Sequence, residues 1–145
     1  MINTSILSIL TNTKVDSPRS VIKQGYGGSD DNNAGCWILT SSVHSICNGT
    51  VLSVDRSPST SAWCVTIEVD ANRWVRYCGL GATNVIVGHK INKSDFIGYA
   101  YKGLMRFEYC TSKKTKFPVR LLSKQLYKTD PSQVLFGQET LSEVT

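Results

Sequence analysis

Short runs of β-branched and aromatic residues fill residues 33 to 127, and turn signals separate them about every eight to twelve positions. Apolar and polar residues alternate within the clearest runs. In WVRYC (74–78), Trp74, Arg76 and Cys78 are expected to face one way, and Val75 and Tyr77 the other. No window keeps a helical period of 3.6 over ten residues. The pattern predicts an all-β, antiparallel domain.

The expected strands cover SVHSI (42–46), TVLSV (50–54), WCVTIEV (63–69), WVRYC (74–78), VIV (85–87), FIGYAY (96–101) and LMRFEYC (104–110). The pair Asn48–Gly49 predicts a tight hairpin between the first two strands. The segments RSPSTSA (56–62) and DANR (70–73) are expected to be a loop and a turn. VRLLSKQLY (119–127) is expected to be a strand or a final turn.

The two ends of the chain differ from this middle zone. Residues 1–32 start with an apolar segment, MINTSILSIL, that is expected to be a first strand or docking segment, and they end in the glycine-rich QGYGGSDDNN. Residues 128–145 form a polar tail with one apolar group, Val134 to Phe136. We therefore predict an N-terminal arm and loop (1–32), a β domain (33–127) and a flexible C-terminal tail (128–145).

Neither a secretion signal nor a membrane span is expected from the sequence. The first residues lack a basic start and a small-residue cleavage site. No stretch approaches the roughly 18 apolar residues of a membrane span. The chain is therefore expected to be made and used without export, and no membrane partner is expected.

The five cysteines, Cys36, Cys47, Cys64, Cys78 and Cys110, are odd in number and include no CxxC pair. This argues against a disulfide framework and against a zinc ribbon, and most are expected to be small buried hydrophobes. His44 and Cys47 could form half of a metal site, but the only other histidine, His89, lies in an expected turn. We expect no metal and no cofactor.

Positive charge gathers near the C-terminal end of the predicted β domain. The chain has a net charge of +5, and no acidic residue interrupts the basic series Lys113, Lys114, Lys116, Arg120, Lys124 and Lys128. This possible contact surface could meet phosphate or an acidic protein face. The alternative is a solvated strand edge and loop. Only Phe117 and Tyr127 could stack on bases here, so nucleic acid is not the expected partner.

One segment, VIVGHKINKSDFIG (85–98), carries a more specific pattern. It resembles the hairpin of the LytM/lysostaphin (M23) zinc peptidases, and also the turn of lipoyl and biotinyl domains and related barrel-sandwich folds. Around it, NAGCW (33–37), NGTVLSV (48–54), CVTIEV (64–69), YCGL (77–80) and LMRFE (104–108) follow the order of the M23 motifs, with Gly35 in register. The resemblance implies an antiparallel β-sandwich of the M23 or barrel-sandwich type.

The same resemblance implies that the family's chemistry is missing. M23 peptidases bind zinc through a His and an Asp of the first motif and the last His of the third, and two further histidines orient and polarise water. In this chain these positions are Asn33, Trp37, Arg106, Gly79 and Leu104. A catalytic zinc needs three N, O⁻ or S⁻ ligands and an open position. These five residues, which we name the vestigial cleft positions, are therefore expected to bind no metal and to catalyse no hydrolysis.

Possible replacement ligands lie beside the lost ones. Cys36 and Cys78 lie next to vestigial cleft positions, and Asp31 and Asn32 lie next to the first motif. Side chains alternate along a strand, so both cysteines are expected to face away from the cleft.

These observations favour a pseudoenzyme with a structural role. The expected function is a component of a virion, such as a bacteriophage tail or baseplate, made in the host cytoplasm and contacting other virion proteins. Trp37 and Arg106 are residue types enriched at interfaces, although Trp37 could equally be core. The alternative is a non-catalytic module, in the envelope or periplasm, that binds peptidoglycan or regulates a hydrolase. An enzyme with unrelated chemistry is disfavoured, because the carboxylates Glu68, Asp95 and Glu108 have no visible partner in the sequence.

Overall fold

The structure is a computed structural model, and it describes residues 3–122 and 124–141. Its helices are α1 (Ser5–Thr11) and α2 (Ser132–Leu135), with short 3₁₀ turns η1 (Pro18–Ser20), η2 (Asp31–Asn33) and η3 (Tyr101–Gly103). Its strands are β1 (Ile22–Gln24), β2 (Cys36–Leu39), β3 (Ser42–His44), β4 (Gly49–Arg56), β5 (Trp63–Asp70), β6 (Arg73–Thr83), β7 (Lys90–Ile91), β8 (Phe96–Ala100), β9 (Leu104–Thr111), β10 (Pro118–Arg120) and β11 (Gln125–Thr129). No helix in the described ranges is long and apolar enough to cross a membrane.

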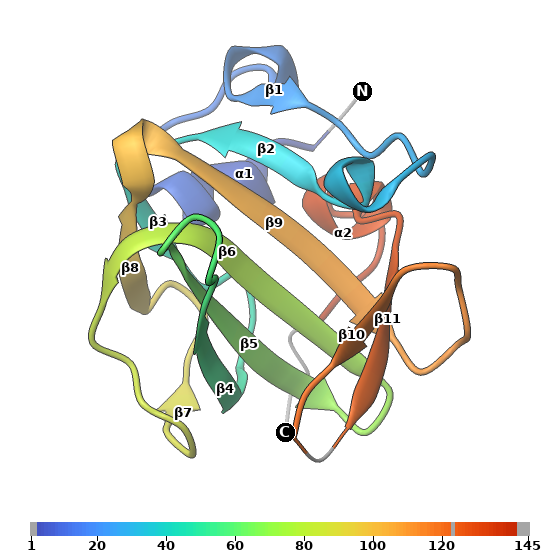
Figure 1. The fold of residues 1–145 in the computed structure, drawn as a ribbon. Helices are drawn as coiled ribbons and strands as arrows, with labels where there is room; N and C mark the ends of the chain where they lie inside the picture. Colours follow the sequence, from blue (N-terminus) through green and yellow to red (C-terminus); the bar gives the residue numbers. More distant parts are fainter. Residues whose placement is uncertain (1–2, 123, 142–145) are drawn as a thin grey trace.

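The strands form one twisted sheet in the order β1-β2-β9-β6-β5-β4-β7 (Figure 1). β8 pairs with β6 on one side and with β3 on the other, and β11 pairs with β9 and with β10 in the same way. Each strand pairing within the described ranges is antiparallel. The predicted all-β, antiparallel class is therefore confirmed.

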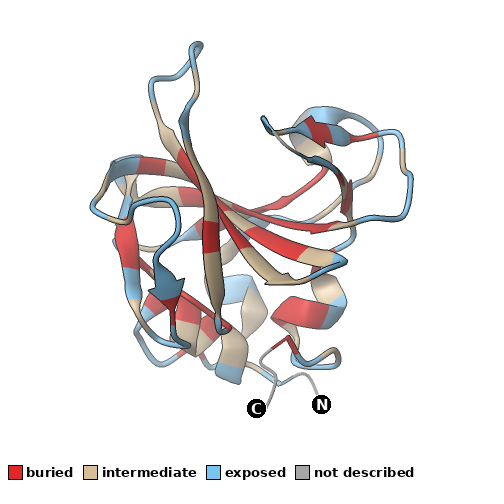
Figure 2. Ribbon diagram, turned by 90° about the horizontal axis from the view of Figure 1, so that it is seen from below, coloured by how far each residue is buried: buried red, intermediate tan, exposed pale blue. Residues whose placement is uncertain are grey.

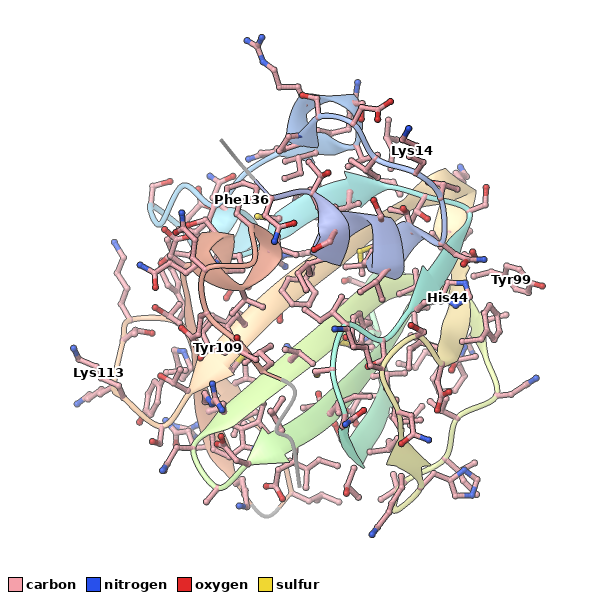
Figure 3. The ribbon with its side chains drawn as sticks, turned by 180° about the vertical axis from the view of Figure 1, so that it is seen from behind. Lys14, His44, Tyr99, Tyr109, Lys113 and Phe136 are labelled. Atoms are coloured by element: carbon pink, nitrogen blue, oxygen red, sulfur yellow. A yellow bond between two sulfur atoms is a disulfide. The ribbon has the colours of Figure 1, made fainter. Side chains whose placement is uncertain are left out.

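One face of the central strands packs against both helices, and we name it the helix face. Val75 and Tyr77 of β6 and Met105 and Phe107 of β9 are fully buried there. Figure 3, seen from behind, shows α1 and α2 lying across the sheet. Alternation along β6 and β9 sends the intervening residues to the opposite face. Along β6 this alternation matches the prediction made from WVRYC.

The opposite face, named the cleft face, has a smaller apolar cluster and a group of charges. Trp74 and Cys110 pack there against Val119 and Leu126 of the β10–β11 hairpin. Figure 2 shows that buried residues concentrate in the middle of the central strands, whereas the loops at their ends are exposed. The remaining part of the cleft face contains the residues that the M23 resemblance singled out.

The apolar start of the chain is a helix that docks against the main core, so of the two expected alternatives the docking segment is confirmed and the first strand was wrong. Leu7, Leu10 and Thr11 are buried on one side of α1, at the i, i+3, i+4 spacing of an amphipathic helix. Leu7 and Leu10 belong to the main core, together with Val15. Residues of the expected N-terminal arm therefore supply part of the domain's interior.

The expected tail also differs from the structure in its described part, residues 128–141. Val134 and Leu135 of α2 and Leu141 are buried in the main core. Glu139 accepts a hydrogen bond from the hydroxyl of Tyr109, and its carboxylate lies 3.4 Å from the Arg73 guanidinium. Residues 131–141 are thus part of the fold, and the rest of the predicted tail, 142–145, lies outside the described residues.

Two predicted hairpins are not formed. β3 pairs with β8 rather than with β4, so Asn48–Gly49 does not form the turn of a hairpin between β3 and β4. Asn48 instead accepts a hydrogen bond from the backbone of Lys93 at 2.8 Å, and a Cβ at Gly49 would lie 2.5 Å from the carbonyl oxygen of Glu68. The segment 85–87 is a loop rather than a strand, and β7 pairs with β4 rather than β8. The return strand from Phe96 is present as β8.

The cysteines differ from prediction in one respect. A disulfide joins Cys64 of β5 to Cys78 of β6, while Cys36, Cys47 and Cys110 are free and buried. The absence of a CxxC pair did not exclude this bond, because neighbouring antiparallel strands bring cysteines 14 residues apart into contact. The three free cysteines are small buried groups, as expected.

Candidate functional site

Four of the five vestigial cleft positions lie together on adjacent strands. In the pairing of β2 with β9, Trp37 stands opposite Arg106 and Leu39 opposite Leu104. A Cβ at Gly79 would lie 3.3 Å from the carbonyl oxygen of Leu104. Directly opposite residues of an antiparallel pair project from the same face. The structure therefore places Trp37, Arg106 and Leu104 on the cleft face with Gly79 beside them.

The fifth position, Asn33, belongs to the turn η2 at the edge of this region. Its amide group bonds to Gln24 and to Ser29, and its backbone N–H donates to the carboxylate of Asp30. The Arg106 guanidinium donates to the carbonyl oxygen of Asp31 in the same turn. η2 is thus held against β9 by a hydrogen bond from the residue at the third ligand position.

The centre of the cleft face is an ionic group, which we name the cationic cluster: Arg76, Arg106 and Lys128 around Glu108. The Glu108 carboxylate lies 2.5 Å from Arg76, 3.2 Å from Arg106 and 3.2 Å from Lys128. Only 2% of the Glu108 side chain is exposed, and the three cations are 12%, 13% and 7% exposed in the same order. A buried carboxylate with three cationic partners is electrostatically satisfied.

Strand register produces this cluster. Arg76 of β6 is directly opposite Glu108 of β9, and Lys128 of β11 is opposite Cys110, the next residue on the same face. Lys128 therefore points onto the cleft face, where its ammonium also lies 2.9 Å from the Asp31 carboxylate. Partial burial alone would raise the pKa of Asp31. The hydrogen bond and charge of Lys128 outweigh this effect, so the pKa lies below its usual range.

Arg106 is fixed on several sides. Its guanidinium lies 5.7 Å from the centre of the Trp37 ring, in a cation–π contact, and it reaches both Glu108 and η2. Its Nε atom is buried without a hydrogen-bond partner. Gly35 makes room for this arrangement, since a Cβ there would lie 3.0 Å from that nitrogen and 2.9 Å from the Phe107 carbonyl oxygen.

This group of residues does not fit a zinc ion. Asn33, Trp37 and Arg106 provide no imidazole, thiolate or carboxylate at the three ligand positions. The cationic cluster and Asp31 together carry three positive and two negative charges, so a divalent cation would meet net repulsion. Among residues 3–122 and 124–141, no group of three His, Cys, Asp or Glu side chains is arranged to hold a metal.

The alternative ligands from the sequence do not assemble. Cys36 lies in the main core, facing away from the cleft as expected. Cys78 does not face away: it stands opposite Arg106 and is bonded to Cys64. Alternation along β6 places Cys78 on the same face as Arg76, which explains the error.

The suggested half-site of His44 and Cys47 is also absent. The ring nitrogens of His44 lie 3.2 Å from the Ser94 carbonyl oxygen and 3.1 Å from the Ser42 hydroxyl. Cys47 is fully buried in the main core, and burial raises the pKa of its thiol to about 12. His89 lies in an exposed loop.

The predicted basic surface is divided by the fold. Lys128 is buried in the cationic cluster, and Lys124 lies 3.1 Å from Glu68 and over the Trp74 ring. Lys113, Lys114, Lys116 and Arg120 remain exposed on the loop after β9 and on the β10 hairpin. Figure 3 shows Lys113 pointing away from the body of the molecule.

The carboxylates that had no visible partner in the sequence do have partners. Glu108 is the centre of the cationic cluster, and Glu68 accepts from the Trp74 indole at 3.1 Å and pairs with Lys124. Asp95 accepts from the backbone N–H of Asn92 at 2.8 Å. The cluster itself was missed, because no sequence motif connects Arg76, Glu108 and Lys128.

The sequence matches no family model and no curated protein. Solved structures do match its fold. Lysostaphin, the antimicrobial peptidase from Staphylococcus simulans, superposes with a TM-score of 0.63 and 19% identity, over 79% of this chain and 48% of that one. The chain has an M23-type fold. It spans about half of the lysostaphin structure.

Two further M23-type structures also superpose on this chain. LytU matches with a TM-score of 0.58 and 17% identity, over 81% of this chain and 86% of that one. A mutant catalytic domain of the prophage-encoded M23 protein EnpA from Enterococcus faecalis matches with a TM-score of 0.55 and 19% identity, over 64% and 82%. At these identities the similarity establishes the M23-type fold and leaves the chemistry to the residues of this chain.

Proposed function

We propose that this chain is a catalytically inactive M23-like domain that serves as a structural component of a virion and acts through contacts with other proteins. The observation that carries the proposal is the position of Arg106. A guanidinium stands where the fold's third zinc ligand is expected, and it is held there by Glu108, Trp37 and the turn η2.

The side chains around Arg106 support the proposed loss of the hydrolytic chemistry. Metal-assisted hydrolysis needs a cation that polarises the scissile carbonyl and lowers the pKa of bound water. The ligand positions hold an amide, an indole and a guanidinium, and the two water-orienting positions hold Gly79 and Leu104. None of these side chains is a general base near neutral pH.

The cationic cluster supports a scaffold role because it joins four segments. Glu108 connects β9 to β6 through Arg76 and to β11 through Lys128, and Lys128 and Arg106 both reach η2. Breaking such a buried ionic group leaves uncompensated charge, so these segments are held in one arrangement. A rigid domain of this kind suits an assembly in which surfaces must be presented in fixed positions.

The virion assignment is supported by a structural neighbour and by the exposed basic residues. One neighbour in fold, EnpA, is described as prophage-encoded, so viral genomes carry domains of this type. The exposed basic residues of the β9–β10 loop and β10 offer a surface for an acidic protein partner.

Two measurements test the proposal separately. Mass spectrometry of virions purified from the source culture is expected to find this chain at a fixed ratio to the major virion proteins, and its absence would overturn the virion role. Digestion of peptidoglycan by the purified protein with added zinc is expected to release no peptide. Release that a chelator abolishes would overturn the claim of inactivity.

A further inference from the structure

A groove with a distinct chemistry lies at the edge of the sheet, where α1 ends. Its volume is about 420 Å³, within the range of about 300–1,000 Å³ common for small-molecule sites. Eight residues form its walls: Thr11, Asn12, Thr13, Leu39, Thr40, Ser41, Ser42 and Gly103. Five of them carry hydroxyl groups, of which those of Thr11 and Thr40 donate to carbonyl oxygens of the chain itself, one carries an amide, and none is charged. The groove therefore favours a neutral ligand that both donates and accepts hydrogen bonds.

An exposed aromatic ring lies on the strand next to one of the groove residues. Ser42, a groove residue, stands opposite Tyr99 in the β3–β8 pairing, so the two side chains share a face. The Tyr99 ring packs 5.0 Å from the Phe96 ring, and Phe96 lies 5.6 Å from His44. Tyr99 is 58% exposed, and Figure 3 shows it projecting into solvent beside His44. Such an exposed aromatic group is a common sign of a binding surface.

We propose that the groove and the Tyr99 ring bind a neutral oligosaccharide. A sugar ring has an apolar C–H face that packs on an aromatic ring and hydroxyl groups around its edge that exchange hydrogen bonds with serine and threonine. The groove supplies the hydroxyl groups, and Tyr99 supplies the aromatic surface next to Ser42. A charged peptide or a phosphate ligand would find no charged side chain in the groove walls.

This site borders the cleft where the groove residue Leu39 stands opposite Leu104, but it shares no residue with those that support the proposed function. None of the five vestigial cleft positions and no member of the cationic cluster belongs to the groove walls. Sugar binding neither requires nor excludes an inactive cleft, so the two proposals succeed or fail independently.

The experiment is an NMR titration of the full chain with three neutral probes: N-acetylchitotetraose, cellotetraose and maltotetraose. At least one probe is expected to give saturable shifts of the backbone amides of residues 11–13, 39–42 and 103. No saturable shift at these amides with any probe up to about 10 mM would overturn the proposal, as would shifts confined to another surface.

Variants identify the contribution of the aromatic ring. Tyr99→Ala is expected to weaken binding at least about tenfold, the loss that follows when one aromatic contact is removed. Tyr127→Ala, a partly exposed tyrosine on β11 at the other side of the molecule, is the matched control and is expected to bind as the parent does (Figure 1). Equal binding by the parent and Tyr99→Ala, with both amide spectra folded, would contradict the proposal.

Discussion

The helix face and the cleft face are formed by the same strands of the central sheet, yet different interactions stabilise them. On the helix face, Tyr77 and Phe107 pack with aliphatic residues from both ends of the chain. On the cleft face, Arg76 and Arg106 surround a carboxylate that is almost fully buried. The helix face is stabilised by apolar burial, which tolerates exchange of similar residues. The cleft face depends on charge balance, which does not tolerate loss of one partner.

This difference also separates fold from chemistry. The chain has an M23-type fold at 19% identity to lysostaphin, and its helix face holds the main apolar core. The polar face is where the zinc ligands of that fold are expected, and here it contains an ionic group instead. One fold can therefore carry different sets of side chains on this face.

The largest expected effect comes from removing the negative centre of the cleft face. Glu108→Gln leaves Arg76, Arg106 and Lys128 buried without their shared anion. We expect the free energy of unfolding to fall by about 3–5 kcal/mol, measured by urea denaturation.

The matched control for Glu108 is Glu68→Gln. Glu68 is 32% exposed and pairs with Lys124, which is 41% exposed. Its replacement should cost less than about 1 kcal/mol. Equal losses in the two variants would show that the cationic cluster does not stabilise the cleft face.

A substitution in α1 tests whether the start of the chain belongs to the helix face. Leu10 is fully buried, so Leu10→Ala should lower the free energy of unfolding by about 2–5 kcal/mol. Leu122→Ala, at a fully exposed leucine, should change it by no more than about 0.5 kcal/mol. If Leu10→Ala is as stable as Leu122→Ala, the start of the chain does not contribute to the stability of the helix face.

A single polar contact within the helix face provides a smaller test. The hydroxyl oxygen of Tyr77 accepts a hydrogen bond from the backbone N–H of Ile46 at 3.0 Å, in the fully buried core. Tyr77→Phe leaves that N–H unpaired and should cost about 1–3 kcal/mol. Tyr101→Phe, at an exposed tyrosine, should cost no more than about 0.5 kcal/mol. A Tyr77→Phe loss no larger than that of the control would show that the contact adds no stability.

The smallest expected effect concerns pH at the edge of the cleft face. Because Lys128 lowers the pKa of Asp31 in the folded chain, ionised Asp31 stabilises the fold above its unfolded pKa of about 3.9, and this contribution disappears as the pH falls below it. Asp31 is 68% exposed, so Asp31→Asn should cost less than about 1 kcal/mol at pH 7 and a smaller amount near pH 2. Urea denaturation at both pH values measures this. If the stability difference between the parent and Asp31→Asn grows toward low pH, the stabilising role of ionised Asp31 is contradicted.

The sequence predicts the alternating strands better than it predicts their partners. The faces of β6 and the β5–β6 hairpin follow from period-2 patterning and a turn at 70–73. The helix α1 has only seven residues, too few for its periodicity to stand out. The Asn48–Gly49 signal was misleading, because Gly49 is required for close approach to Glu68 rather than for a hairpin turn.

The structure brings together several residues that the motif order had grouped, but the sequence did not reveal the ionic contacts around them. The order of motifs brought Trp37, Leu104 and Arg106 to one face, as the strand pairing shows. The cationic cluster depends on register between residues far apart: Arg76 and Glu108 are separated by 32 residues, and Lys128 lay in the expected tail. Local patterns carry no information about such pairings, so charges that look solvated in the sequence are buried in the fold.

Zinc binding measured by isothermal titration calorimetry is the most direct test of the central claim, that the side chains of the cleft, with Arg106 foremost, prevent metal binding in an intact M23-type fold. The comparison is between the parent chain and the variant Asn33→His, Trp37→Asp, Arg106→His, which restores the expected ligands. We predict no binding by the parent and one zinc per chain for the variant. Circular dichroism is expected to show that both proteins are folded. Stoichiometric zinc binding by the parent would contradict the account.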